Sequence, residues 1–378
     1  MVNTSCRITL AFCYAAGIAA TSCGPSVAAD RSELPKEVPW LSETVTPPKT
    51  IPGTPAEKLS RLLVNANGRQ ITTLAQWEKR RKHLRAAWMK FLGPMPVKRP
   101  PVKLKVLRTD TLRGLTRQLV RYESEAGLKV EGYLLRPTDI QPGKKRAALV
   151  ALHATTTETI DQIAGVRGNP TRQIGLQLAQ RGFVVFCPRC FLWQSVSGYG
   201  EAVAKFRQRH PKTLGMHKML YDAQRGIDVL ESLSYVDAQR IGAVGHSLGA
   251  KETLYLTAFD QRIKAAVASE GGICFRSTNW NAPWYLGKSI GDQSFPRNHH
   301  ELLALIAPRP FLILAGEKGS GAADGDRNWP YLTAAQPVYR FYDRPVRLGM
   351  FNHHRGHSIP PKAFSRMADW LETYLRAP

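Results

Sequence analysis

From residue 147 onward, short apolar segments alternate with segments of helical periodicity, and this alternation is the feature that most constrains the fold. The apolar segments are "AALVALH", "GFVVFCP", "RIGAVG", "IKAAVAS", "RPFLILAG" and "VRLGMFN". Between the second and the third, residues Lys218–Leu233 place their apolar side chains on one helical face. Such alternation is typical of a mostly parallel central sheet with helices on both faces. The sequence therefore predicts an α/β fold.

The chain before this region predicts an N-terminal arm that is partly extended and partly helical. Residues 30–55 are rich in Pro and Thr, which favours an extended arm. Trp77, Leu84 and Trp88 then recur at helical spacing until "GPMPVKRPP" ends the pattern. Two alternating segments, "TRQLVRYES" and "LKVEGYLLRP", predict a hairpin. We therefore expect an arm and helical segment over 30–105 and a catalytic domain over 106–378.

The first 29 residues have the pattern of an export signal. Arg7 precedes the apolar run Ile8–Ala20, and "SVAAD" offers small residues for cleavage before Asp30. We therefore expect a signal peptide at 1–29 and a periplasmic or extracellular protein. The alternative is a lipoprotein, because "ATSC" weakly resembles a lipoprotein box that ends at Cys23. Contact with a membrane is expected only in that case.

The net charge of +24 would suit an acidic polymer or an anionic surface as partner. The densest basic run, "EKRRKHLR", lies in the predicted helix, where a solvated face explains it. It is not accompanied by a zinc-finger spacing or an aromatic RNA-binding pattern, so the sequence argues against nucleic acid as partner. The sequence does not predict an oligomeric state.

Three cysteines remain after the export segment, namely Cys187, Cys190 and Cys274. An odd number does not suit a disulfide framework, and the "CPRC" pair closes an apolar strand without a second pair to complete a zinc site. We expect buried thiols or one local disulfide, and no metal site.

The segment "RIGAVGHSLGAKE" places Ser247 between a strand and a helix. A Gly-x-Ser-x-Gly pattern alone is weak, but a nucleophile elbow requires this context of strand, sharp turn and helix. The alternative is an ordinary turn between a strand and a helix. We interpret Ser247 as a nucleophile, because a base and an acid follow in the chain order that such a fold requires.

The base is expected on the loop after the last strand, where "FNHHRGHSIPP" offers three histidines. His357 is the preferred candidate because it lies furthest past the strand, and His353 and His354 are expected to shape the pocket or to pack beneath the loop. The acid remains open between Asp324, which follows "PFLILAG", and Glu270, which follows "IKAAVAS". Asp326 is the third candidate, and each acid could instead cap a helix or pair with a cation.

The oxyanion that forms during acyl transfer requires two hydrogen-bond donors. The backbone N–H of Leu248, directly after the serine, is the first candidate. The second donor is expected in the loop after "ALVALH", from the backbone of Ala154, Thr155 or Thr156.

The region from residue 147 to the C-terminus resembles the α/β-hydrolase superfamily, and within it the dienelactone-hydrolase-like and acetyl-xylan-esterase-like group. The phrases that carry the resemblance are "LHATTT", "GHSLGAKETLYLTAFDQRIKAAVASEGG", "HELLALIAPRPFLILAG" and "HHRGHSIPP". The chain also partly resembles glucuronoyl esterases, whose serine is followed four residues later by a lysine, here Lys251, and whose acid stands where Glu270 stands. It departs from them at Leu248, where they carry an arginine.

Two further segments are candidates for the substrate pocket. Residues 191–219 exceed a minimal connection, and long insertions often form lids or pocket walls. Trp280 and Trp284 lie past Glu270 and could stack on a sugar or pack in the core. Lys251 is either a ligand contact or a surface lysine.

These features together predict an exported serine esterase that cleaves a carboxylic ester, such as an acetyl or uronoyl ester of a polysaccharide, without metal or organic cofactor. The runner-up is a serine peptidase of the same fold. A third alternative is a hydrolase-fold protein that binds acidic polysaccharide without catalysis.

Overall fold

The protein is described here by a computed structural model that covers residues 37–51, 59–292, 294–319, 321 and 325–376. The predicted signal peptide, Cys23 and Asp324 lie outside these ranges. None of the helices in the described ranges is both long enough and apolar enough to cross a membrane.

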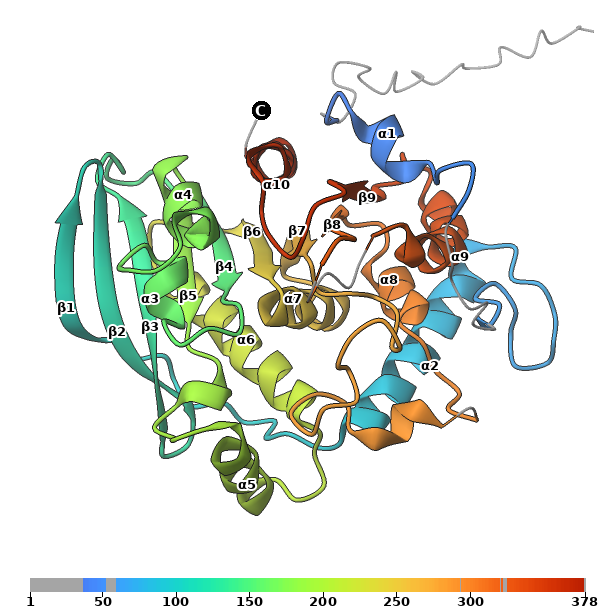
Figure 1. Cartoon of the computed structure of the whole chain (residues 1–378), viewed down its shortest axis with the longest axis horizontal. Coiled ribbons are helices and arrows are strands. Elements are labelled where there is room, and N and C mark those ends of the chain that lie inside the picture. Colours follow the sequence, from blue (N-terminus) through green and yellow to red (C-terminus); the bar gives the residue numbers. More distant parts are fainter. Residues whose placement is uncertain (1–36, 52–58, 293, 320, 322–324, 377–378) are drawn as a thin grey trace, which may run out of the picture. The chain divides into compact units, whose positions relative to one another are not determined.

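In the described part of the chain, nine strands form one sheet in the order β1-β2-β3-β5-β4-β6-β7-β8-β9 (Figure 1). The strands are β1 (Lys105–Leu112), β2 (Leu115–Glu125), β3 (Leu128–Pro137), β4 (Arg146–Leu152), β5 (Val184–Pro188), β6 (Val236–His246), β7 (Ile263–Ser269), β8 (Phe311–Ala315) and β9 (Leu348–Asn352). β4 to β9 are parallel to one another, whereas β1, β2 and β3 add an antiparallel extension beside β5. The predicted mostly parallel sheet is confirmed.

Helices cover both faces of this sheet. They are α1 (Leu41–Val45), α2 (Leu74–Leu92), α3 (Ile160–Ile163), α4 (Ile174–Gln180), α5 (Tyr199–Arg209), α6 (Gly215–Glu231), α7 (Leu248–Phe259), α8 (His300–Ile306), α9 (Trp329–Tyr339) and α10 (Pro361–Leu375). The alternating side chains of the strands divide the core into two clusters, since Ala148 and Val150 face α6 and α7 whereas Leu149 and Ala151 face α4 and α10. Side chains of successive residues in a strand point to opposite faces, so one apolar run serves both layers.

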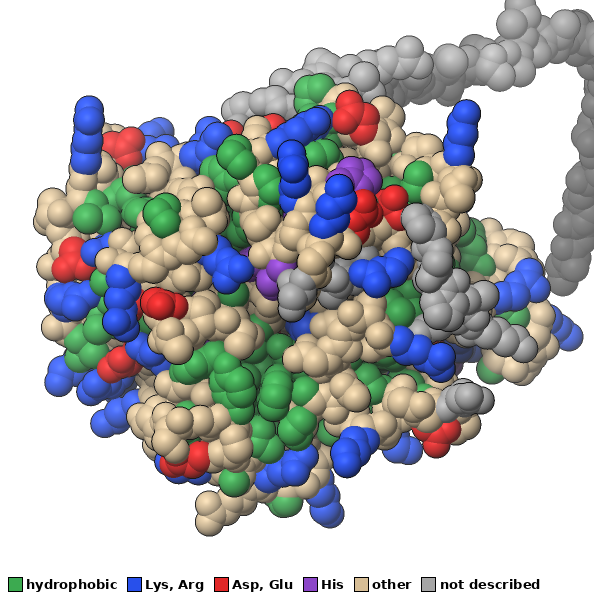
Figure 2. Space-filling view, viewed as in Figure 1, with side chains coloured by type: hydrophobic (Ala, Val, Ile, Leu, Met, Phe, Trp, Pro, Cys, Tyr) green, Lys and Arg blue, Asp and Glu red, His purple; other side chains and the backbone are tan. Residues whose placement is uncertain are grey.

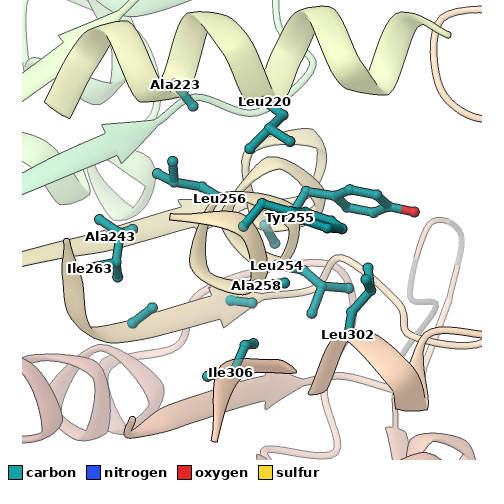
Figure 3. Packing of buried hydrophobic residues seen from close by; sticks show 14 of the residues in the cluster. Leu220, Ala223, Ala243, Leu254, Tyr255, Leu256, Ala258, Ile263, Leu302 and Ile306 are labelled. Carbon is teal, nitrogen blue, oxygen red and sulfur yellow. The ribbon is translucent and has the colours of Figure 1, made fainter. Parts of the chain in front are cut away.

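Helix α7 lies in the centre of the larger cluster (Figure 3). All twelve of its residues are buried, and Leu254 and Leu256 pack among side chains of α6, α8 and β6. A helix that is buried along its whole length is enclosed by other elements, even though α7 also carries the polar side chains of Lys251 and Glu252. The residue that precedes α7 is therefore held on a rigid support.

The predicted N-terminal helix is α2, which packs against the same layer. Thr73 caps it by accepting a hydrogen bond from the Gln76 N–H, and Gly93 ends it with φ of 84°. Trp88 is fully buried and its indole N–H donates to Glu301 on α8 over 2.6 Å. Two residues of the basic run have a structural role, since Arg81 and Arg85 donate to the backbone carbonyls of Leu305 and Phe259. Lys79 and Lys82 are exposed, as predicted for a solvated face.

The cysteines Cys187, Cys190 and Cys274 are free and buried, as one of the two predicted alternatives states. Burial raises the pKa of the Cys187 thiol far above its ordinary value. A buried neutral thiol behaves as a small apolar side chain.

Candidate active site

Ser247 lies at a sharp turn between β6 and α7. Its φ is 58°, in a region that residues with a side chain rarely adopt. The two flanking glycines are required by close approach, because a Cβ at Gly245 would lie 2.2 Å from the Gly249 carbonyl oxygen and one at Gly249 would lie 2.0 Å from that of Leu152. The turn therefore has the strained geometry that the Gly-x-Ser-x-Gly pattern predicts.

The predicted oxyanion donors lie on either side of this close approach. Leu248 is the first residue of α7, and the N–H groups in the first turn of a helix have no partner within the helix. The loop that holds Ala154 and Thr155 follows β4, whose last residue, Leu152, meets Gly249. The backbones of both candidate donor segments are therefore neighbours beside Ser247.

His153 fixes the start of that loop. Its Nε2 accepts the Cys190 N–H over 3.1 Å, which leaves Nδ1 to donate to the Ala154 carbonyl over 2.8 Å. Complete burial lowers the pKa of His153 to about 4, so the ring is neutral and keeps this tautomer at neutral pH. The ring ties the loop after β4 to the segment after β5.

Glu270 follows β7 and is the acid that contacts the predicted base. Its carboxyl group is fully buried, its φ is 59°, and its Oε2 lies 3.4 Å from Nδ1 of His357. Its other oxygen, Oε1, lies 2.8 Å from Nε2 of His353. This contact is longer than a hydrogen bond of good geometry, and contacts between an acid and a base of an active site commonly shorten when substrate binds.

His353 is oriented by its own backbone neighbours. The Arg355 N–H donates to Nδ1 of His353 over 3.2 Å, so the ring proton belongs on Nε2, which faces Glu270. Gly316 leaves the space for this contact, because a Cβ there would lie 2.3 Å from Oε1 of Glu270 and 2.8 Å from Cε1 of His353. Glu270 is thus held between two histidines.

The predicted base, His357, lies beside the residue that precedes Ser247. The ring of His357 lies 4.8 Å from that of His246, the residue directly before Ser247. His246 is buried, and its pKa is held well below the ordinary value, first by burial and second by the charge of His357. A neutral His246 does not add a second positive charge beside a protonated His357.

The remaining acids and histidines of these loops form separate contacts. Oδ1 of Asp326 accepts a hydrogen bond from Asn352 over 3.1 Å, and it is not paired with His357. His354 pairs with Glu317 over 2.7 Å and is exposed. Asp324 lies outside the described residues. Of the two candidate acids that the structure describes, Glu270 contacts the predicted base and Asp326 does not.

Lys251, which lies on α7 four residues after Ser247, and Trp280 are buried next to each other. Nζ of Lys251 donates to the Gly271 carbonyl over 2.6 Å and to Thr278 over 3.1 Å, and it lies 4.0 Å from the Trp280 ring. Trp280 has no exposed surface and donates to the Gly272 carbonyl over 2.9 Å. Trp280 therefore packs in the core. Lys251 is buried instead of lying on the surface, and it supports the loop after Glu270.

A row of aromatic side chains extends from His153 along the long insertion. The ring of Trp193 lies 5.1 Å from that of His153, Tyr199 lies 5.3 Å from Trp193, and Trp284 lies 5.3 Å from Tyr199. Trp193, Tyr199 and Trp284 are half-buried, unlike Trp280. We call these three residues the aromatic border. The sequence singled out only Trp284, although the length of the insertion at 191–219 pointed to a pocket wall there.

A parallel sheet with a serine turn after β6, an acid after β7 and a histidine after β9 defines the α/β-hydrolase fold. Residues 146–307 match the sequence model of the dienelactone hydrolase family. The predicted resemblance is confirmed at this level.

Solved structures and curated relatives extend the comparison. The chain superposes on a glucuronoyl esterase from Solibacter usitatus with a TM-score of 0.68 and 17% identity, over 85% of this chain and 99% of that one. A 4-O-methyl-glucuronoyl methylesterase 1 of Wolfiporia cocos is 22% identical over 293 residues, which are 70% of this chain and 67% of that protein. These matches support the predicted class of carboxylic ester hydrolases.

A second kind of relative is a peptidase. Dipeptidyl-peptidase 5 of Porphyromonas gingivalis is 27% identical over 163 residues, which are 41% of this chain but 22% of that protein. The chain thus spans about a quarter of the length of such relatives.

Proposed function

We propose that the protein hydrolyses carboxylic esters through an acyl-enzyme on Ser247. The observation that carries this proposal is the pairing of Glu270 with His357 at the edge of the sheet where Ser247 occupies its strained turn. A nucleophile, a base and an orienting acid in this arrangement form the minimal set for acyl transfer.

In the proposed reaction, His357 accepts the proton of the Ser247 hydroxyl as its oxygen attacks the ester carbonyl. Glu270 orients the His357 ring and stabilises its positive charge. The N–H of Leu248 and one from Ala154 or Thr155 hold the oxyanion. His357 then returns the proton to the leaving alcohol, and water, activated by the same histidine, releases the acid and restores the serine.

We further propose a carbohydrate ester, either acetyl or uronoyl, as the substrate. The aromatic border supports this, because half-buried rings are suited to stack on the apolar faces of sugars. The names of the glucuronoyl esterase and the methylesterase described above point in the same direction. The signal-like segment 1–29 supports export to the compartment where such polymers occur.

The test is hydrolysis of p-nitrophenyl acetate by the purified protein beside its Ser247→Ala variant at matched concentration. We expect the variant to lose activity by a factor on the order of 10⁴ or more and to keep its unfolding midpoint, because only the nucleophilic oxygen is removed. Equal activity in the two proteins would remove Ser247 from the mechanism.

A dipeptidyl p-nitroanilide belongs in the same assay, because the relation to a dipeptidyl-peptidase favours a peptidase as the second candidate. Cleavage of the anilide with a higher kcat/KM than the ester would assign the protein to peptidases. Cleavage of neither would leave a protein that has the hydrolase fold but binds without catalysis.

A further inference from the structure

A basic pocket lies beside the aromatic border. The cavity measures about 380 Å³, and its walls include Arg121, Lys129, Glu131, Arg189 and Trp193. Three cationic side chains therefore face one carboxylate. A pocket of this size has room for one or two sugar units.

The pocket lies at the same edge of the sheet as Ser247. Arg189 follows the carboxyl end of β5, and β4, β5 and β6 are parallel, so their carboxyl ends meet at one edge. β3 is antiparallel to β5 and pairs Gly132 with Pro188, which brings Lys129 and Glu131 to that edge. Arg121 joins them because it pairs with Glu131 across β2 and β3.

Two contacts join the pocket to the loop of the proposed oxyanion donors. Arg189 donates to Thr159 over 2.8 Å, and Trp193 packs against His153. Both partners belong to the segment that follows β4 and contains Ala154 and Thr155. The pocket therefore lies beside the loop of the proposed oxyanion donors, on the side of β5.

The charges in the pocket are only partly balanced. Arg121 lies 2.7 Å from Oε1 of Glu131, and Arg189 lies 3.6 Å from its Oε2, so one carboxylate is shared by two guanidinium groups. Lys129 adds a third positive charge and is exposed. Guanidinium groups bind carboxylates through paired hydrogen bonds, so the pocket suits a second carboxylate from a ligand.

We propose that this pocket binds a free carboxylate of an acidic polysaccharide, so that the ester cleaved at Ser247 is one carried on a polyuronate chain. The substrate class rests on the proposed esterase function, whereas the binding of the carboxylate does not. The net charge of +24 agrees with such a partner. Figure 2 shows Lys and Arg side chains spread over the viewed face, with fewer Asp and Glu among them.

The test compares two pairs of substitutions that remove the same charge. The pocket pair, Arg121→Gln with Lys129→Gln, removes two cations from the pocket. The control pair, Arg113→Gln with Lys144→Gln, removes two exposed cations that precede β2 and β4, at the opposite edge of the sheet. The net charge is equal in the two variants, so a difference between them reports the position of the charge.

Binding is measured by calorimetry at an ionic strength of about 0.15 M, where the Debye length is about 8 Å, with oligogalacturonate, which holds free carboxylates and no ester. We expect the pocket pair to weaken binding about tenfold and the control pair less than about twofold, since only close charges act strongly through salt solution. A neutral xylo-oligosaccharide of equal length should bind more weakly than oligogalacturonate. No binding to the wild type, equal losses in both pairs or equal affinity for the neutral sugar would each overturn the proposal.

A kinetic measurement connects the pocket to Ser247. Oligogalacturonate should raise the apparent KM for p-nitrophenyl acetate without changing kcat, and the pocket pair should need about ten times more of it. Inhibition that lowers kcat alone would place the bound polymer outside the substrate cleft and overturn the proposed substrate class. If the wild type does not hydrolyse the acetate, the esterase function fails, while calorimetry still decides whether the pocket binds carboxylates.

Discussion

Ser247, Glu270 and His357, the residues proposed for catalysis, form what we call the catalytic edge. This edge and the aromatic border lie at neighbouring strand ends but are held in different ways. At the catalytic edge, Ser247 and Glu270 directly follow buried parallel strands, and backbone geometry determines where their side chains point. At the border, Trp193 and Tyr199 belong to a connection between β5 and α6 and contact each other mainly through their rings. This difference explains how proteins of one fold can share a reaction but act on different substrates. The connections between elements vary more among such proteins than the elements that they connect.

Apart from loss of the proposed nucleophile itself, the largest effect is expected at the catalytic edge, from Glu270→Gln. Loss of the negative charge leaves His357 without its orienting partner, and kcat on p-nitrophenyl acetate should fall by a factor on the order of 10³ or more. Steady-state kinetics with the amide variant measures this directly.

Asp326→Asn is the matched control, because it removes an acid that contacts Asn352 instead of the base. Its kcat should change by less than about threefold. Asp324→Asn is the third variant. A fall in kcat as large as that of Glu270→Gln would assign the role of the orienting acid to Asp324, in the loop after β8.

An intermediate effect is expected where the two regions meet, at His153. The folded protein holds the pKa of His153 at about 4, below the ordinary value of 6.5, because the ring is buried. The unfolded chain therefore binds a proton more readily, so stability present above pH 6.5 is lost as the pH falls toward 4. One ring contributes about 3 kcal/mol to this loss.

Urea unfolding of the wild type and His153→Gln at neutral pH and at pH 4 measures this contribution. The variant should be less stable at neutral pH but should lose less free energy of unfolding on acidification. Identical losses of unfolding free energy in the two proteins would show that protonation of His153 does not contribute to the loss of stability in acid.

The smallest effect is expected from His353, which touches Glu270 on the side away from the base. His353→Phe should lower kcat about tenfold with little change in KM, because Glu270 loses a neighbour that can donate a hydrogen bond. His353→Gln can supply an N–H donor, and it should recover part of the loss. An equal loss in both variants would mean that the shape of the ring matters and not its proton.

The sequence predicted the strands that carry Ser247 and Glu270 far better than the aromatic border. The strands β4, β6, β7 and β8 are short apolar runs, and their order indicates which residues follow each strand. β1 was missed because it is an edge strand whose residues are mostly exposed, so it lacks an apolar pattern. Edge strands pack on one side only and leave a weaker pattern in the sequence.

The choice of acid could not be made from the sequence, since Asp324 and Glu270 follow neighbouring strands of the same sheet. The distance from Glu270 to His357 depends on how the loop after β9 returns across the sheet, which is a tertiary contact. The sequence also could not predict which of Trp280 and Trp284 is buried, because two tryptophans four residues apart have the same composition around them. Only packing places one in the core and the other at the border.

The positive φ angles of Ser247 and Glu270 have a consequence for how the sequence can change. Glycine adopts such angles without steric strain, so glycine at Ser247 or Glu270 would relax the backbone by about 1 kcal/mol. The larger entropy of glycine in the unfolded chain offsets about the same amount. The two strained positions can therefore carry side chains at little net cost in stability, and this leaves the turns after β6 and β7 free to hold reactive groups.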